Sequence, residues 1–214
     1  MNPSRYSNLS AAGLALTQSL SQYEDRDDVV VLAIALAGVP VAKEIATALN
    51  RPLDLILIRR LLIGDGPGAH LCAVNVAGET ILDDGINLVA TLSSPQESFL
   101  AEAIADFKRR EQLCRRGRKP LSLTDQTVIV VDCGIRTGST MNAAARALRK
   151  TDAKLITGAV PVTSREGYAA VAPLFDELIY LQQAAQFVNA GYWYADFRRP
   201  GDDEVGKLLG PEAN

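Results

Sequence analysis

Cysteine and histidine are both scarce in this chain of 214 residues. The three cysteines, Cys72, Cys114 and Cys133, are far apart and odd in number. Their spacing matches neither paired thiols nor a set of metal ligands, so no protein-held metal is expected. Such a pattern is typical of a protein kept in a reducing compartment, and it argues against a small fold held together by disulfides.

Long apolar runs are absent as well. The longest extends from Val29 to Ala42 and contains Pro40, so it is too short to span a bilayer. The N-terminal sequence MNPSRYSNLS has no apolar signal core behind a basic start. We therefore expect a cytoplasmic protein without a membrane partner.

The chain has no excess of one charge, since 22 Lys and Arg residues stand against 25 Asp and Glu residues. This balance gives no general attraction to nucleic acid. The local exception is KRREQLCRRGRKP, from Lys108 to Pro120. Its basic residues, from Lys108 to Lys119, have two interpretations. They form a site for RNA or anionic ligands, or they belong to a solvated helix end, where cations suit the negative end of the helix dipole. The overall balance favours the helix end and no nucleic-acid partner.

Apolar runs alternate with helical patterns along the chain, which is typical of a mostly parallel sheet covered by helices. The length suits one domain over residues 1–214, and 48% apolar residues suffice for a substantial core. We predict an α/β protein with a central parallel sheet of about five strands flanked by helices. The predicted strands are Val29–Leu36, Leu53–Arg59, Val128–Asp132, Leu155–Val162 and Glu177–Leu181, with a helix over Val41–Leu49 and a hairpin over Ala73–Ala77 and Thr80–Asp83.

The longest helix is predicted from Pro95 to about Arg116. Ser94 is a suitable N-cap, and Glu97 completes a capping box with it. Proline suits the first turn of a helix, and Gly117 is placed to end this one.

The most informative stretch is VIVVDCGIRTGST, from Val128 to Thr140, which begins as a strand and ends as the opening of a helix. Gly134 and Gly138 allow a tight turn and a close approach of the backbone to a ligand. The backbone N–H groups from Arg136 to Thr140 would then point toward one place at the positive end of a helix, which favours phosphate. The stretch has no Walker A lysine and no GxGxxG pattern. A plain strand–turn–helix junction is the alternative.

VIVVDCGIRTGSTM resembles the motif of type I phosphoribosyltransferases that binds phosphoribosyl pyrophosphate (PRPP). DVVVLAIALAGVPVAKEIATALNRPLDLILIRR (Asp28–Arg60) and GYWYADF (Gly191–Phe197) are similar to the same parts of a group of uncharacterised bacterial phosphoribosyltransferase-domain proteins. The resemblance implies the type I phosphoribosyltransferase fold with a small hood made by the C-terminal region. It also implies PRPP and a base as substrates, Mg²⁺ bound mainly through PRPP, and a homodimer.

The resemblance further implies roles for residues in and before this loop. The 5-phosphate would be bound by Arg136, Thr137, Gly138, Ser139 and Thr140. Two acids normally hold the ribose hydroxyls. Asp132 keeps the first place, where it would steady the ribose as positive charge develops, and Cys133 takes the second. A thiol accepts hydrogen bonds poorly, so the ribose contact is expected to be weakened.

The loop after the first strand normally binds the pyrophosphate with backbone N–H groups and an arginine. Here Leu36 occupies the place of that arginine, followed by Ala37 and Gly38. Loss of one aimed cation costs on the order of 3 kcal/mol of transition-state stabilisation. Arg59 and Arg60 are candidates to replace it, and the alternative is that they are ordinary strand-end cations.

Two further segments carry expectations from the resemblance. Leu62–Leu71 is rich in glycine and corresponds to a loop that closes over the substrate; it contains His70, which is either catalytic or simply solvated. The acceptor base is expected to stack on an aromatic side chain among Phe187, Tyr192, Trp193 and Tyr194. We assign base binding to Phe187 with Val188, and a cluster that only packs the sheet edge is the alternative.

The expected function is PRPP binding with transfer of the phosphoribosyl group to a nitrogenous base, with activity weakened at Cys133 and Leu36. The alternative is a non-catalytic regulatory protein that senses PRPP or nucleotides and keeps only the phosphate pocket. A phosphate-ester hydrolase would need a cluster of metal-binding carboxylates, which the sequence does not offer.

Overall fold

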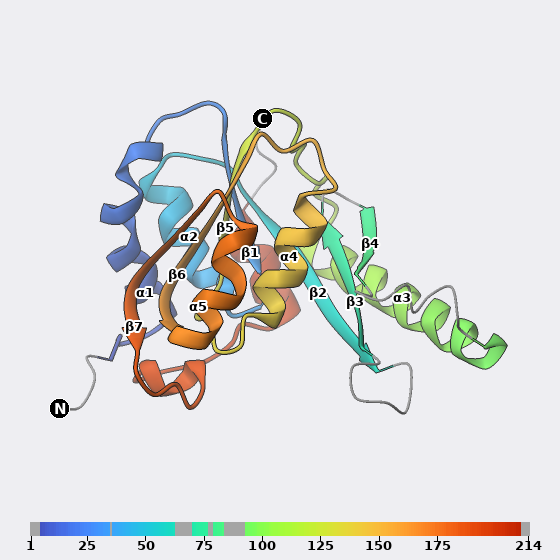
Figure 1. Cartoon of the computed structure of the whole chain (residues 1–214). Helices are drawn as coiled ribbons and strands as arrows, with labels where there is room; N and C mark the ends of the chain where they lie inside the picture. Colours follow the sequence, from blue (N-terminus) through green and yellow to red (C-terminus); the bar gives the residue numbers. More distant parts are fainter. Residues whose placement is uncertain (1–4, 35, 63–69, 77–78, 84–92, 211–214) are drawn as a thin grey trace.

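The computed structural model describes residues 5–34, 36–62, 70–76, 79–83 and 93–210. Within them, a single sheet of seven strands has the order β4-β3-β2-β1-β5-β6-β7 (Figure 1). The five parallel strands confirm the predicted central sheet: β1 (Val29–Ile34), β2 (Leu53–Leu62), β5 (Thr127–Val131), β6 (Leu155–Ser164) and β7 (Glu177–Ala184). The predicted hairpin is also confirmed: β3 (His70–Val76) and β4 (Glu79–Asp83) pair antiparallel and extend the sheet beyond β2.

The hairpin corrects one boundary. The carboxyl half of β2 pairs with β3, from Leu57 opposite Asn75 to Leu62 opposite His70. This pairing lengthens β2 beyond Arg59 and makes His70 the first residue of a strand, whereas the sequence placed it in a loop. Its side chain lies outside the described residues, as do residues 63–69, where the closing loop was expected.

Helices cover both faces of the sheet (Figure 1). On one face lie α1, the 3₁₀ helix η1, α2, α3 and α6; on the other lie α4, α5 and η3. Strand β1 is apolar throughout because both of its faces are buried: Val29 and Val31 face the first layer, while Val30 and Leu32 face the second. The helices are α1 (Leu9–Thr17), η1 (Gln18–Tyr23), α2 (Gly38–Ala48), α3 (Ser94–Arg115), α4 (Ser139–Leu148), α5 (Arg165–Val171), η3 (Ala172–Leu174), η4 (Ala190–Trp193) and α6 (Asp202–Leu209).

Helix α3 has the predicted extent, but its cap differs by one residue. Ser93 is the N-cap, and its backbone N–H donates to the side chain of Gln96 at 2.8 Å. The predicted capping box of Ser94 with Glu97 was wrong, because the sequence contains two overlapping capping-box patterns and the helix uses Ser93 with Gln96. Ser93 has the extended backbone that an N-cap requires, with φ −79° and ψ 158°. The helix ends at Arg115, and its C-cap Arg116, just before Gly117, has a left-handed φ of 52°.

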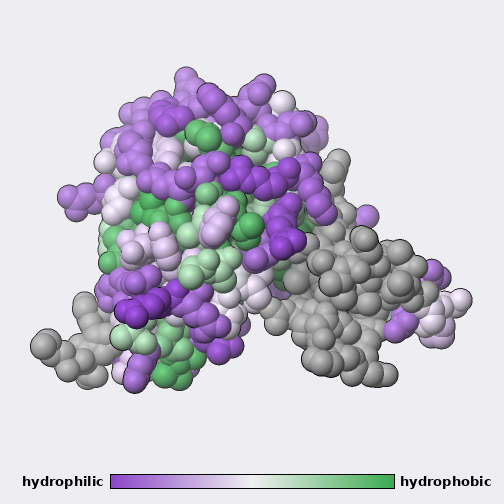
Figure 2. Space-filling view, viewed as in Figure 1, coloured by the Kyte–Doolittle hydropathy of each residue, from purple (hydrophilic) through white to green (hydrophobic). Residues whose placement is uncertain are grey.

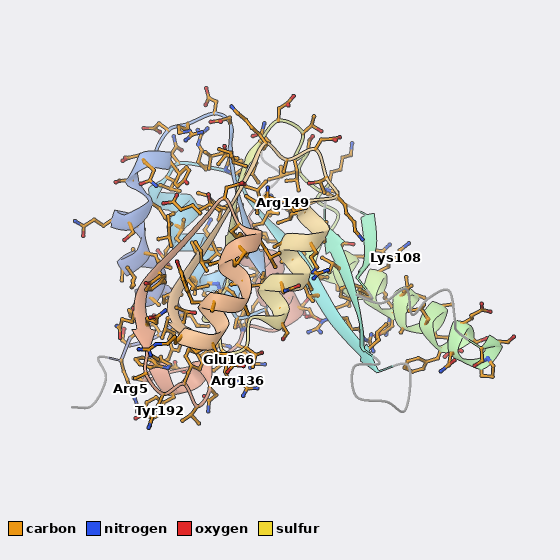
Figure 3. All side chains as sticks on the ribbon, in the orientation of Figure 1. Arg5, Lys108, Arg136, Arg149, Glu166 and Tyr192 are labelled. Atoms are coloured by element: carbon orange, nitrogen blue, oxygen red, sulfur yellow. The ribbon has the colours of Figure 1, made fainter. Side chains whose placement is uncertain are left out.

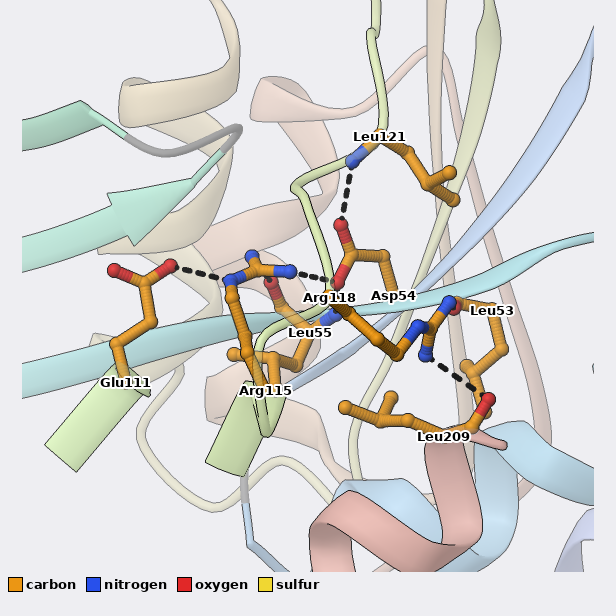
Figure 4. Close-up of polar contacts among 8 residues, drawn as sticks. All are labelled: Leu53, Asp54, Leu55, Glu111, Arg115, Arg118, Leu121 and Leu209. Carbon is orange, nitrogen blue, oxygen red and sulfur yellow. Dashed lines mark hydrogen bonds and ion pairs between the residues drawn. The ribbon is translucent and has the colours of Figure 1, made fainter. Parts of the chain in front are cut away.

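The basic stretch at the end of α3 is not simply a solvated helix end. Arg115 is buried and donates to Asp54, 2.5 Å away, and to Glu111, 2.8 Å away (Figure 4). Arg118 donates to the backbone carbonyls of Leu209 and Leu53 at 2.9 and 3.2 Å. These arginines therefore join α3 to the start of β2 and the end of α6.

The outer surface agrees with this layered arrangement. Figure 2 shows hydrophilic residues over much of the face formed by α4 and α5, with apolar residues between them. No helix in the described part of the chain has the length and apolar character needed to cross a bilayer.

Candidate functional site

The loop after β5 is pinned to the neighbouring strand at the carboxyl edge of the sheet. Strand β5 lies between β1 and β6, and the loop spans residues 132–138 before α4 begins. The Ile135 N–H donates to the carbonyl of Val162 at 2.9 Å, and the Ile135 carbonyl accepts from Ser164 at 2.8 Å. A loop at this edge, between adjacent parallel strands, lies where open α/β sheets bind ligands.

The start of α5 holds the loop from its other side. The Ser164 hydroxyl donates to the carbonyl of Arg136 and accepts the N–H of Gly167 at 2.7 Å. A Cβ on Gly167 would lie 2.6 Å from the Arg136 carbonyl oxygen, so a larger residue would push the loop away. The sequence analysis did not identify Ser164 and Gly167 as residues that hold the loop. The pattern that could have indicated them is a serine able to cap α5, followed three residues later by glycine.

Gly138 is required by both conformation and packing. Its φ is +81°, a left-handed conformation that favours glycine. A Cβ there would also lie 2.5 Å from Cγ1 of Val171. This residue is the N-cap of α4, and its carbonyl accepts the Asn142 N–H at 2.8 Å. The helix therefore begins with its positive end at the loop.

The loop encloses a polar cavity of about 230 Å³, lined by Asp132 and by residues 134–141. Within the described part of the chain, the backbone N–H groups of residues 136–140 have no protein acceptor. Thr137 and Thr140 are exposed and Ser139 is half-buried, so three hydroxyls are available beside these donors. Figure 3 shows Arg136 and Glu166 at this edge, the lower one in the view. This arrangement of donors can bind a phosphate.

Asp132 and Cys133 have different surroundings. Asp132 lines the cavity, and burial raises the pKa of its carboxyl from 3.8 to about 6, although the Cys133 N–H donates to it at 2.7 Å. Cys133 is only 7% exposed and packs in the core. Burial raises the pKa of this thiol well above its ordinary value, and the nearby Asp132 charge raises it further. Cys133 is therefore an uncharged thiol beside a carboxylate, and its contact with ribose remains a prediction.

The segment after β7 crosses this edge and forms the expected small hood. The Tyr194 hydroxyl donates to the carbonyl of Cys133, 2.5 Å away. Phe187 lies against Gly134, where an added Cβ would be 3.5 Å from its ring, and it also packs on Trp193 with ring centroids 6.2 Å apart. Sequence reasoning named Tyr194 only as an aromatic near the base and did not foresee its contact with the loop.

The residues assigned to the base lie in this hood. Val188 is 68% exposed, and Figure 2 shows apolar surface at the lower edge of the view, below β7. Phe187 is partly buried against the core. An exposed apolar side chain beside an aromatic ring suits a flat base, but base binding by Phe187 and Val188 remains a prediction.

Of the residues assigned to pyrophosphate, Gly38 lies beside the backbone of Asp132. A Cβ on Gly38 would lie 2.7 Å from the Val131 carbonyl and 3.4 Å from Cα of Asp132, so the start of α2 touches the end of β5. Leu36 and Arg59 line one cavity of about 300 Å³.

Of the two arginines of β2, Arg59 is held by a residue of α3. The Arg59 guanidinium donates to Asp106 of α3 at 2.7 Å, so part of its charge is already balanced. The side chain of Arg60 lies outside the described residues. Pyrophosphate binding by either residue, and by Leu36, Ala37 and Gly38, remains a prediction.

A divalent metal would find few protein ligands at this site. Among the described residues, no three His, Cys, Asp or Glu side chains gather as they would in a metal cluster. Asp132 is the one carboxylate lining the phosphate cavity, as far as the described residues extend. One carboxylate together with ligand phosphates suits Mg²⁺, which keeps several waters, whereas a buried neutral thiol does not.

The fold and this loop together define an α/β protein with a polar cavity at the carboxyl edge of a parallel sheet. The phosphoribosyl transferase domain family matches residues 6–193. The chain therefore belongs to this family, as its resemblance at the loop implied.

Individual relatives agree with that assignment. Two Mycobacterium tuberculosis proteins, from strains CDC 1551 and H37Rv, carry the provisional name phosphoribosyl transferase; each is 33% identical over 199 residues, or 92% of this chain. The match covers 45% of each relative, so this chain spans less than half of their length. The crystal structure of TT1426 from Thermus thermophilus is similar with a TM-score of 0.80 and 26% identity, over 96% of this chain and 97% of that one.

Proposed function

We propose that this protein binds PRPP and transfers its phosphoribosyl group to a nitrogenous base. The observation that carries the proposal is the set of unbonded N–H groups of residues 136–140 around one polar cavity, with Asp132 at its rim. The 5-phosphate would accept from these N–H groups and from the hydroxyls of Thr137, Ser139 and Thr140.

The reaction would be a displacement at the anomeric carbon of the ribose. A ring nitrogen of the base forms the new bond to that carbon, the bond to the pyrophosphate oxygen breaks with its electron pair, and the nitrogen loses its proton to solvent. Asp132 is mostly ionised above a pH of about 6. Its carboxylate would accept the ribose hydroxyls and stabilise positive charge that develops on the sugar.

Mg²⁺ is the cofactor expected for this family. Asp132 would contact it, and most of its other ligands would be PRPP oxygens and water. When bound, Mg²⁺ would neutralise charge on the departing pyrophosphate.

We further propose that residues 1–214 act as one phosphoribosyltransferase-like domain, because a single sheet contains all the described strands. In the proposed reaction, the acceptor lies against Phe187 and Val188, which contribute the aromatic ring and exposed apolar surface of the hood.

Calorimetry and turnover test the proposal together. PRPP with Mg²⁺ and ribose 5-phosphate should both bind, and inorganic phosphate should compete with them. Pyrophosphate release is then measured with a panel of purine and pyrimidine bases. We expect slow turnover, because Leu36 and Cys133 alter contacts that strengthen in the transition state. Absence of PRPP binding contradicts the proposal, whereas binding without turnover for any base favours the regulatory alternative.

A further inference from the structure

The ends of helices α3 and α6 border a cavity that the proposed reaction does not use. Its volume is about 570 Å³, and it is lined by three glycines and four cations, which are Arg115, Arg116, Arg118 and Lys207. No Asp or Glu is among the described residues that line it. Arg118 donates to the carbonyl of Leu53, the first residue of β2, so the cavity lies at the amino edge of the parallel strands, opposite the loop after β5.

Two of the four cations hold the fold together. Arg115 is bonded to Asp54 and Glu111, so its charge is balanced by acids (Figure 4). Arg118 donates only to backbone carbonyls, and it has no ion-pair partner among the residues that the structure describes. Its Nε is buried and has no hydrogen-bond partner in the same part of the chain. The positive charge of Arg118 therefore has no acid opposite it.

The other two cations have no such structural role. Neither Arg116 nor Lys207 has a side-chain ion pair or hydrogen bond within the described ranges. Bonds from Arg198 lower the pKa of Glu204, and the charge of Lys207, one turn later, lowers it further. Both carboxylate oxygens of Glu204 already accept from Arg198 at 3.0 Å, so Lys207 is not engaged there. Because neither cation donates to a helix-end carbonyl, capping of the helices does not explain them.

Close packing brings Arg116 and Lys207 to the same place, although they come from different helices. A Cβ on Gly206 would lie 2.4 Å from Cδ of Arg116 and 2.9 Å from the carbonyl oxygen of Cys114. Only a residue without a side chain therefore allows α6 to come this near to the end of α3. The Arg116 side chain crosses α6 at Gly206, the residue just before Lys207.

The backbone adds a donor at this point. Gly117 has a φ of +88°, and a Cβ built on it would meet no described atom within 4 Å. Its N–H has no protein acceptor as far as the described residues extend. Two carbonyls at the helix ends are already bonded, since that of Gln112 accepts from Arg116 at 2.9 Å and that of Lys207 accepts from Gly210 at 3.2 Å. These bonds reduce the negative potential that helix ends otherwise have.

We propose that this cavity is a second anion-binding site, which takes a phosphate monoester. The guanidinium of Arg116 can bond two phosphate oxygens at once, and Lys207 and the Gly117 N–H can donate to the third. Arg118 adds a charge that no acid balances. The site is independent of the proposed reaction because it lies at the other edge of the sheet. A concave site in a chain of net charge −3 favours a small anion over RNA.

The experiment is an NMR titration of the ¹⁵N-labelled full chain with inorganic phosphate, followed through the backbone amide signals. The signal of Gly117 should shift in a saturable way as phosphate is added. Sodium chloride at the same ionic strength should not reproduce this shift, because screening by salt has no preferred site. Signals of residues 136–140 report the loop after β5 in the same spectra, so the two sites are read separately.

Three variants test which side chains hold the ion. Arg116→Gln and Lys207→Gln should each weaken the affinity measured at Gly117 about 5- to 10-fold, as expected for a charge-assisted hydrogen bond. Lys108→Gln is the matched control, because it removes one charge from the exposed side of α3, outside the cavity, and should change that affinity less than twofold. The response of residues 136–140 should be the same in all three. Since the two cations come from different helices, either variant decides the matter if the other fails to fold.

Several results would overturn the proposal. A Gly117 signal that does not respond to phosphate, or that responds equally to sodium chloride, shows an adventitious ion only. Unchanged affinity in Arg116→Gln and Lys207→Gln has the same meaning. If a single-stranded RNA oligonucleotide shifts Gly117 at lower concentration than phosphate, and phosphate does not displace it, the surface binds RNA and the small-anion assignment is wrong. Silence of residues 136–140 under phosphate would instead contradict the proposed function and leave this inference intact.

Discussion

Substitution of Asp132 by asparagine should stabilise the ligand-free protein at neutral and alkaline pH. Burial raises the pKa of this carboxyl from 3.8 to about 6, so the folded state prefers the protonated form. A raised carboxyl pKa makes folding less favourable as pH increases from about 4 to above 6. The side-chain carbonyl of the asparagine could still accept the N–H of Cys133, which now lies 2.7 Å from Oδ1 of Asp132, so the local hydrogen bond would be kept.

The size of the effect follows from the pKa difference. A shift from 3.8 to about 6 corresponds to about 3 kcal/mol, at about 1.4 kcal/mol for each unit. Because Asp132 keeps part of its surface accessible in the cavity, we expect Asp132→Asn to raise the free energy of unfolding by about 1–3 kcal/mol at pH 8. Near pH 4 the two proteins should differ little, since the wild-type carboxyl is then protonated in the folded state.

Urea unfolding of the dialysed proteins at pH 4, 6 and 8 measures this difference. Comparing variant with wild type at each pH cancels the titration of the other acids, whose surroundings are unchanged. The same variant should bind PRPP more weakly, by about tenfold, because it lacks the charge that accepts the ribose hydroxyls. An Asp132→Asn protein that is less stable than the wild type at pH 8 would refute the reasoning, as would a gain in stability that is equally large at pH 4.

Three other substitutions test separate parts of the structure. Gly138→Ala should cost about 1–3 kcal/mol of unfolding free energy and abolish phosphate binding, because the loop must leave its left-handed conformation. Arg115→Met should cost about 3–5 kcal/mol, because Asp54 is left buried without its charged partner. Cys133→Asp should lower the thermal midpoint, since a second carboxylate is added in a buried position, and PRPP with Mg²⁺ should restore part of the loss.

The Arg115→Met measurement has a matched control, and each of the other two has a result that would contradict it. For Arg115→Met the control is Lys108→Met on the exposed side of the same helix, which should change stability by less than about 0.5 kcal/mol. Retention of phosphate affinity in Gly138→Ala, measured by calorimetry, contradicts the role given to the loop. A Cys133→Asp protein as stable as the wild type at pH 8 in scanning calorimetry contradicts the burial of that side chain.

The sequence alone determined the elements whose signal is local. Apolar runs predicted the five parallel strands, and the run is unbroken in β1 because a strand covered on both faces needs apolar residues at every position. Glycine and hydroxyl residues between Asp132 and Thr140 predicted an anion-binding loop. Left-handed turns and free N–H groups at a helix start depend on residues that are adjacent in the sequence. The cap of α3 was misplaced by one residue because two serines offered equivalent local patterns.

Only the tertiary structure decided the contacts between residues that are distant in the chain. The hydroxyl of Tyr194 reaches the carbonyl of Cys133 across 61 positions, and Arg115 reaches Asp54 across the same separation, 61 positions, elsewhere in the fold. No local pattern encodes such pairs, because they depend on how the crossovers stack helices on the sheet. The raised pKa of Asp132 has the same origin, since burial is a property of the assembled chain.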